Sequence, residues 1–71
     1  MEYLVIVEKS ASGYGAHVPD LPGCVAVGES RGEVLRLIRE GIELHLEAMQ
    51  AAGESLPEPT CTGEMVSVRA A

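Results

Sequence analysis

Apolar and polar residues follow one another in the first part of the chain in the manner of short β-strands. Residues 3–9 are rich in β-branched and aromatic side chains and end at a turn of small residues at 10–13. The strand pattern resumes over 14–18 and again over 24–27, after a loop with two prolines. The sequence therefore predicts three short strands, of which the first two form a hairpin.

A long helix is predicted after the strands. Ser30 and Glu33 have the spacing of a capping box, in which the serine hydroxyl accepts from the N3 amide and the glutamate reaches back to the cap amide. Gly53 supplies a left-handed C-terminal position, so the helix should span 31–52. Residues 64–69 alternate like a final strand. The predicted class is α+β, in the order β-β-β-α-β, with a small, mainly antiparallel sheet and one long helix packed on one face.

The apolar face of this helix is wider than one sheet requires. At 100° per residue, one stripe contains Val34, Leu35, Ile38, Ile42, His45, Leu46 and Met49. A second stripe contains Leu37, Gly41, Leu44, Ala48 and Ala51. Together they cover more than roughly 200°, whereas packing on one sheet needs a face little wider than 100°. The surplus predicts a second contact surface, and a close helix approach would explain the glycine in the second stripe.

The first predicted strand is apolar on both faces. Tyr3, Val5 and Val7 share one face, and Leu4 and Ile6 share the other. One helix covers one face, so the other must be covered by the segment at 53–63 that returns after the helix, by a second copy or by a different protein. Because an exposed sheet edge also invites pairing, we expect a homo-oligomer, most simply a two-fold dimer. The residues expected to mediate self-association are Tyr3, Val5, Val7, Leu37, Gly41 and Leu44.

The length and net charge of the chain argue against some classes of function. A chain of 71 residues predicts a single domain, 1–71, and without Phe or Trp its core must be small. The net charge of −6 argues against non-specific nucleic-acid binding and favours a basic partner, or simply solubility. The apolar run near the N-terminus is too short for a signal peptide or a membrane span. We therefore expect a cytoplasmic protein that does not contact a membrane.

The residues that could carry chemistry are scattered. A zinc site would have to combine His17, Cys24, His45 and Cys61, which lack the paired spacing of structural zinc ligands. Cys24 has no oriented base, so a small buried hydrophobe is the favoured interpretation, and both cysteines are expected to be free thiols. A two-metal nuclease would need the acids Glu8, Asp20 and Glu29 to converge. We expect no metal, no cofactor and no enzymatic activity, with a residual metal-dependent nuclease as the enzyme alternative.

The most distinctive string is Val-Pro-Asp-Leu-Pro-Gly-Cys at 18–24. It is followed by Gly-Glu-Ser at 28–30, the capped helix, and Leu-Pro-Glu-Pro at 56–59. In this order the elements resemble the HicB-like antitoxin family over about residues 3–59. The resemblance implies a partial ribonuclease-H-like fold without nuclease activity. It also implies a protein that neutralises a small basic HicA-type mRNA interferase by covering its catalytic surface.

The same resemblance indicates which partners and contacts to expect. Antitoxins of this family commonly carry a C-terminal DNA-binding region, for which residues 1–71 leave no room, so we expect no direct nucleic-acid contact. The candidate toxin contacts are His17, Asp20, Glu40, Glu43 and Glu47. An alternative for the three helix glutamates is a solvated face with Arg36–Glu40 and Arg39–Glu43 pairs. An alternative function is an orphan structural or regulatory homo-oligomeric interaction module without a toxin partner.

Overall fold

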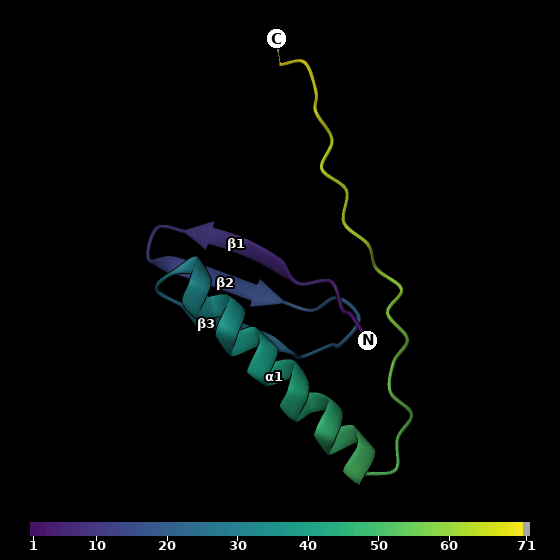
Figure 1. Cartoon of the computed structure of the whole chain (residues 1–71). Coiled ribbons are helices and arrows are strands. Elements are labelled where there is room, and N and C mark those ends of the chain that lie inside the picture. Colours follow the sequence, from purple (N-terminus) through teal and green to yellow (C-terminus); the bar gives the residue numbers. More distant parts are fainter. Residues whose placement is uncertain (71) are drawn as a thin grey trace.

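The computed structural model describes residues 1–70 and contains three strands followed by one long helix (Figure 1). The elements are β1 (Ile6–Ser10), β2 (Gly13–His17), β3 (Val25–Gly28) and α1 (Arg31–Ala51). The strands form one antiparallel sheet in the order β1-β2-β3. The predicted α+β class is confirmed.

The strand register gives each face of the sheet its own rows of side chains. One row that faces the helix consists of Val7, Ala16 and Ala26. The neighbouring row, which points to the opposite face because side chains alternate along a strand, consists of Ile6, His17 and Val25. The small alanines on the inner face allow the helix to lie close to the sheet.

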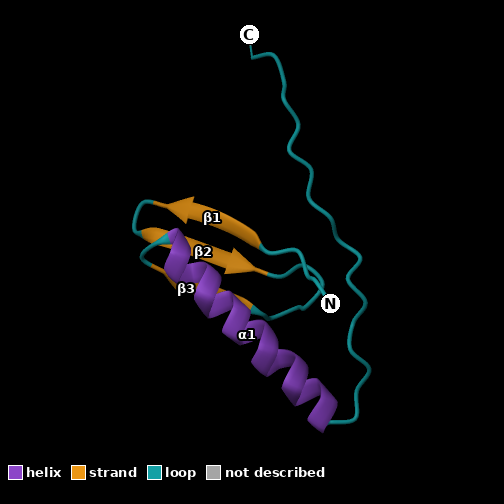
Figure 2. Ribbon diagram, viewed as in Figure 1, coloured by secondary structure: helices purple, strands orange, loops and turns teal. Residues whose placement is uncertain are grey.

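The core lies between the sheet and α1, which covers one face only (Figure 2). The buried residues are Ala16, Val18, Leu21, Cys24, Val34 and Ile38. Ile42 and Leu46 extend the helix contribution as half-buried neighbours. The first predicted helix stripe is therefore the one that packs on the sheet. The helix lies mainly over β3 and β2 and only marginally over β1.

The helix begins with the predicted serine cap. The Ser30 hydroxyl accepts a hydrogen bond from the Glu33 amide at 3.1 Å. The Glu33 carboxylate, in turn, accepts from the Glu29 amide at 3.4 Å and not from the amide of Ser30 itself. Two of the amides around the first turn are thus satisfied by side chains, which holds the turn after β3 against the helix.

The helix ends at the predicted glycine. Gly53 has φ +75°, and its amide donates to the Gln50 carbonyl at 3.0 Å. The next amide, of Glu54, donates to the Met49 carbonyl at 2.9 Å. This pair of bonds is a Schellman motif, which closes the last turn and sends the chain back toward the N-terminus.

The prediction of a last strand over 64–69 is wrong. Residues 54–70 are extended but belong to no strand, and the end of this segment projects alone from the body (Figure 1). Met65 is 100% exposed, Val66 76% and Val68 81%. The alternation specifies an extended backbone, whereas a strand also needs a neighbour for its amides and carbonyls, and the described chain offers none along this stretch.

Candidate functional site

The distinctive loop at 18–24 folds back on itself and completes the core. The Leu21 amide donates to the Val18 carbonyl and the Cys24 amide to the Leu21 carbonyl, each at 3.0 Å. The Val18 amide donates to the Cys24 carbonyl at 3.2 Å, which closes the loop. Leu21 is fully buried as a result. The first role of this string is therefore structural.

Asp20, on the same loop, holds the returning C-terminal segment. One carboxylate oxygen accepts from the amides of Thr60 and Cys61, both at 3.0 Å. The other accepts from the Thr60 hydroxyl at 2.7 Å. We call these three residues the Asp20 clamp. The carboxylate that was expected to contact a partner is thus engaged within its own chain.

The clamp also sets the acidity of its members. The Thr60 hydroxyl and the Cys61 amide lower the pKa of Asp20 to about 2, because hydrogen bonds favour the charged carboxylate. The Asp20 carboxylate raises the pKa of the Cys61 thiol, and burial raises that of Cys24. Both cysteines are free, and both shifts disfavour the reactive thiolate.

The face of the sheet opposite α1 is open and apolar. We call Ile6, Glu8, His17, Val25 and Val27 the outer sheet face. Val25 is 69% exposed and Val27 78%. Gly15 lies between Glu8 and Val27 in the register and leaves a shallow hollow there. Of the predicted contact residues, only His17 lies on this face.

The predicted acidic contacts on the helix form a separate surface. Glu40, Glu43 and Glu47 are all exposed. Arg36 lies 3.3 Å from Glu40 and Arg39 lies 3.9 Å from Glu43, so the two predicted pairs are present. Among residues 1–70, Glu47 is the member of this set without an ion pair. The helix face is consequently less negative than its glutamates alone suggest.

Most residues predicted for self-association are used within the chain. Tyr3, Val5 and Val7 are half-buried and pack against the core. Gly41 faces Cys24, whose sulfur would lie 3.7 Å from an added Cβ, so its neighbour is the loop at 18–24 of the same chain. Leu37 is half-buried, whereas Leu44 is 67% exposed.

An apolar groove remains open between α1 and residues 1–5, the segment that leads into β1. We call it the β1–α1 groove; its volume is about 380 Å³. Its apolar lining includes Tyr3, Val5, Leu35, Ile38, Ile42 and Leu46. Sequence reasoning missed this groove, since the position of a helix across a sheet is a tertiary property.

Within residues 1–70, no three His, Cys, Asp or Glu side chains are grouped in a way that could hold a metal ion. In the same part of the chain, no helix is both long enough and apolar enough to cross a lipid bilayer. What the surface does offer is three apolar features: the outer sheet face, the β1–α1 groove and the exposed C-terminal segment.

Several relatives share much of this chain. A UPF0150 protein of Thermoplasma acidophilum is 38% identical over 58 residues, covering 80% of this chain and 84% of that protein. A 14.9 kDa protein from the rep-hol intergenic region of Haemophilus phage HP1 is 38% identical over 82% of this chain. A UPF0150 protein of Helicobacter pylori is 50% identical over 65%. The matches span 44% of the phage protein and 64% of the Helicobacter protein.

Two further comparisons concern the family and the fold. A chain in the solved HicA3 and HicB3 toxin-antitoxin complex superimposes with a TM-score of 0.70 and 27% identity, covering 84% of this chain and 70% of that one. The family model described as the HicB-like antitoxin of bacterial toxin-antitoxin systems matches residues 3–69, which is nearly the whole chain. The chain therefore belongs to the HicB-like antitoxin family.

Proposed function

We propose that this protein is a non-enzymatic antitoxin that binds a small basic HicA-type mRNA interferase and occludes its catalytic surface. The observation that carries the proposal is the likeness, over 84% of this chain, to a chain of a toxin-antitoxin complex. Such a protein would act in the cytoplasm, where its partner meets mRNA.

The outer sheet face is the surface that suits a protein partner. Val25 and Val27 present apolar area that the chain itself leaves uncovered, and His17 lies beside them in the register. Glu8 borders this apolar strip, and Glu29 lies at the rim of the adjoining hollow. An apolar centre with a polar border is the usual anatomy of a protein interface.

The net charge suits a basic partner. With 11 acidic and 5 basic residues, the chain attracts a cationic protein over distances longer than a contact. Complementary charge of this kind raises the association rate and makes it sensitive to salt. Glu40, Glu43 and Glu47 contribute to this attraction, although two of them already have arginine partners. We assign them a steering role and assign the close contact to the outer sheet face.

Co-expression tests the proposal and the assigned face together. The protein encoded by the neighbouring gene is expressed alone and with this chain, and growth and co-purification are measured. We expect the neighbour to arrest growth alone and to be neutralised and retained by the wild-type chain. A neighbour that is neither toxic nor retained contradicts the antitoxin role.

Two matched variants locate the face. Val27→Asp places a charge on the outer sheet face, and Leu44→Asp places the same charge at a similarly exposed leucine of α1. We expect the first variant to lose neutralisation and the second to keep it. If instead Val27→Asp neutralises normally and Glu40→Lys/Glu43→Lys/Glu47→Lys does not, the helix is the contact surface.

The second candidate function is an orphan structural or regulatory homo-oligomer. The exposed apolar segment at 64–69 favours it, because such a segment is suited to pairing between identical chains. The co-expression experiment separates the two candidates, since an orphan module has no toxic neighbour to retain.

A further inference from the structure

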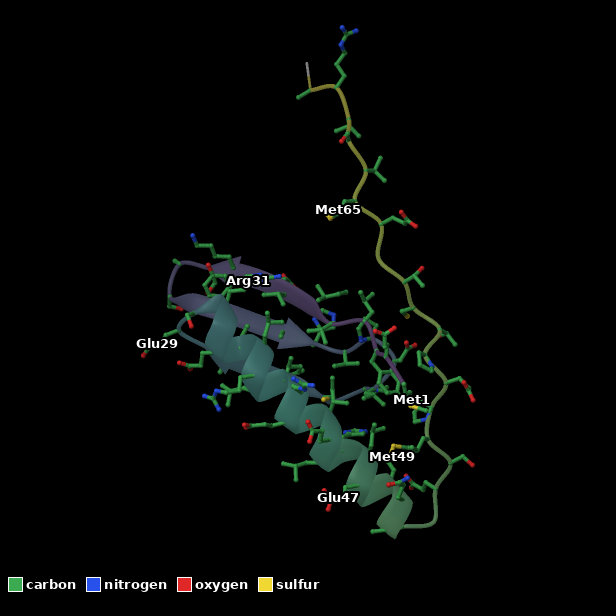
Figure 3. The ribbon with its side chains drawn as sticks, in the orientation of Figure 1. Met1, Glu29, Arg31, Glu47, Met49 and Met65 are labelled. Atoms are coloured by element: carbon green, nitrogen blue, oxygen red, sulfur yellow. The ribbon has the colours of Figure 1, made fainter. Side chains whose placement is uncertain are left out.

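Residues 64–69 form an arm whose root is fixed and whose end makes no contact with its own sheet. The Asp20 clamp holds Thr60 and Cys61, and the Tyr3 hydroxyl donates to the Pro57 carbonyl. Beyond Cys61, the described part of the chain makes no hydrogen bond to the body. Met65 accordingly lies clear of the sheet and helix (Figure 3). The root is held while the apolar part of the arm stays in solvent.

The arm alternates like a strand and carries two valines on one side. Glu64, Val66 and Val68 share that side, and Met65, Ser67 and Arg69 lie on the other, because alternate residues of an extended chain point in opposite directions. The family match extends through residue 69, so the arm belongs to the domain that the relatives share. It is therefore a shared element of the fold that lacks a pairing partner in the single chain.

The β1 edge and the adjoining groove have the complementary form. Within residues 1–70, nothing pairs with the outer edge of β1, whose backbone groups are open to another strand. The β1–α1 groove lies on the helix side of residues 3–5, just before that edge, and Leu35, Ile42 and Leu46 line it together with Arg39 and Glu43. A strand added along β1 and the residues that lead into it would direct every second side chain toward this groove. Two valines two residues apart match that requirement.

The arm of the same chain is directed away from this groove. Gly63 lies against Leu4, where an added Cβ would be 3.3 Å from the leucine side chain. Leu4 alternates with Tyr3 and Val5, which face the helix, so the arm has already passed the start of β1 toward the opposite face. With its root held there, the segment extends outward, in position to reach another molecule (Figure 1).

We propose that the arm of one copy adds to the β1 edge of a second copy, with Val66 and Val68 in the second copy's β1–α1 groove. The exchange is reciprocal, because the two copies present the same arm and the same groove, and it closes as a two-fold dimer. The outer sheet face stays open in this dimer. The proposal is thus independent of the antitoxin role and can be tested on the purified chain alone.

Two single variants of the arm test the contact. Val66→Asp and Ser67→Asp add the same charge at neighbouring positions on opposite sides of the arm. Light scattering coupled to size exclusion should give twice the mass of 7.5 kDa for the wild type and for Ser67→Asp. Val66→Asp should raise the dimer dissociation constant at least about tenfold, because it places a charge in an apolar groove. A wild type that is monomeric up to high micromolar concentrations, or equal effects of the two variants, overturns the proposal.

Cysteine pairs identify which groove the arm occupies. In a Cys61→Ser background, Val66→Cys is combined in turn with Leu35→Cys, Ile42→Cys and Leu46→Cys, and the proteins are oxidised. We expect at least one pair to give a disulfide-linked dimer on a non-reducing gel. A disulfide within a single chain would place the arm in its own groove and overturn the exchange. The absence of any disulfide across the three pairs would overturn it as well.

Discussion

At the scale of single residues, Asp20 connects two segments that are far apart in the sequence. Its carboxylate accepts from Thr60 and Cys61, forty and forty-one positions away. Nothing in the local pattern around Asp20 indicates this contact, because a hydrogen bond between distant segments exists only once the chain is folded. The sequence reasoning placed Asp20 among the partner contacts, whereas the structure assigns it to the root of the arm.

The clamp should open in acid. An unfolded aspartate has a pKa of about 3.9, and the clamp lowers the pKa of Asp20 to about 2. A lowered pKa means that the stabilisation is complete above about pH 4 and is lost as the pH falls toward the folded pKa. We expect the Thr60 and Cys61 amide signals in NMR spectra to shift together over this range. Asp20→Asn should abolish that transition; an unchanged transition in the variant would contradict the assignment.

Leu21 tests the structural role of the distinctive loop. Its side chain is fully buried in the core, so Leu21→Ala leaves a cavity there. The expected loss of unfolding free energy is about 2–5 kcal/mol, measured by urea denaturation. Leu44→Ala, at a position that is 67% exposed, is the matched control and should change stability by less than about 0.5 kcal/mol. Equal effects at the two sites would contradict the buried role.

At the scale of elements, the sequence predicts correctly those features that depend on interactions between neighbouring residues. The capped start at Ser30 and the left-handed Gly53 located the helix to within one residue, because both act through neighbouring backbone groups. The alternation located three strands, with β1 beginning later than expected. It did not reveal that Val25 and Val27 point outward, or that 64–69 has no pairing partner within residues 1–70. The first depends on which side of the sheet the helix covers, and the second on where the chain runs after the helix.

The serine cap gives a prediction for the helix. Ser30→Ala removes the hydroxyl that accepts from the Glu33 amide, and the expected cost is about 1 kcal/mol of unfolding free energy. Thermal unfolding followed by circular dichroism measures it. Ser55→Ala, an exposed serine after the helix, is the control and should behave as the wild type. A cap variant as stable as this control would show that the bond contributes nothing.

At the scale of the whole molecule, one helix cannot cover a three-stranded sheet on both faces and also span its width. The remaining apolar surface divides into the outer sheet face and the β1–α1 groove. These surfaces suit different occupants, since the first is bordered by acids and the second matches the side of the arm that carries the two valines. The length and composition of the chain already indicate that its small core needs another chain for stability. The two surfaces, in contrast, could be located only from the fold.

We propose that this member of the family neutralises a basic RNA-cleaving toxin by binding it. The direct measurement is RNA cleavage by the purified product of the neighbouring gene as this chain is titrated in. We expect cleavage to stop near an equimolar amount of this chain, Leu44→Asp to inhibit equally well, and Val27→Asp to fail to inhibit. Cleavage that continues in the presence of excess wild-type chain would contradict it.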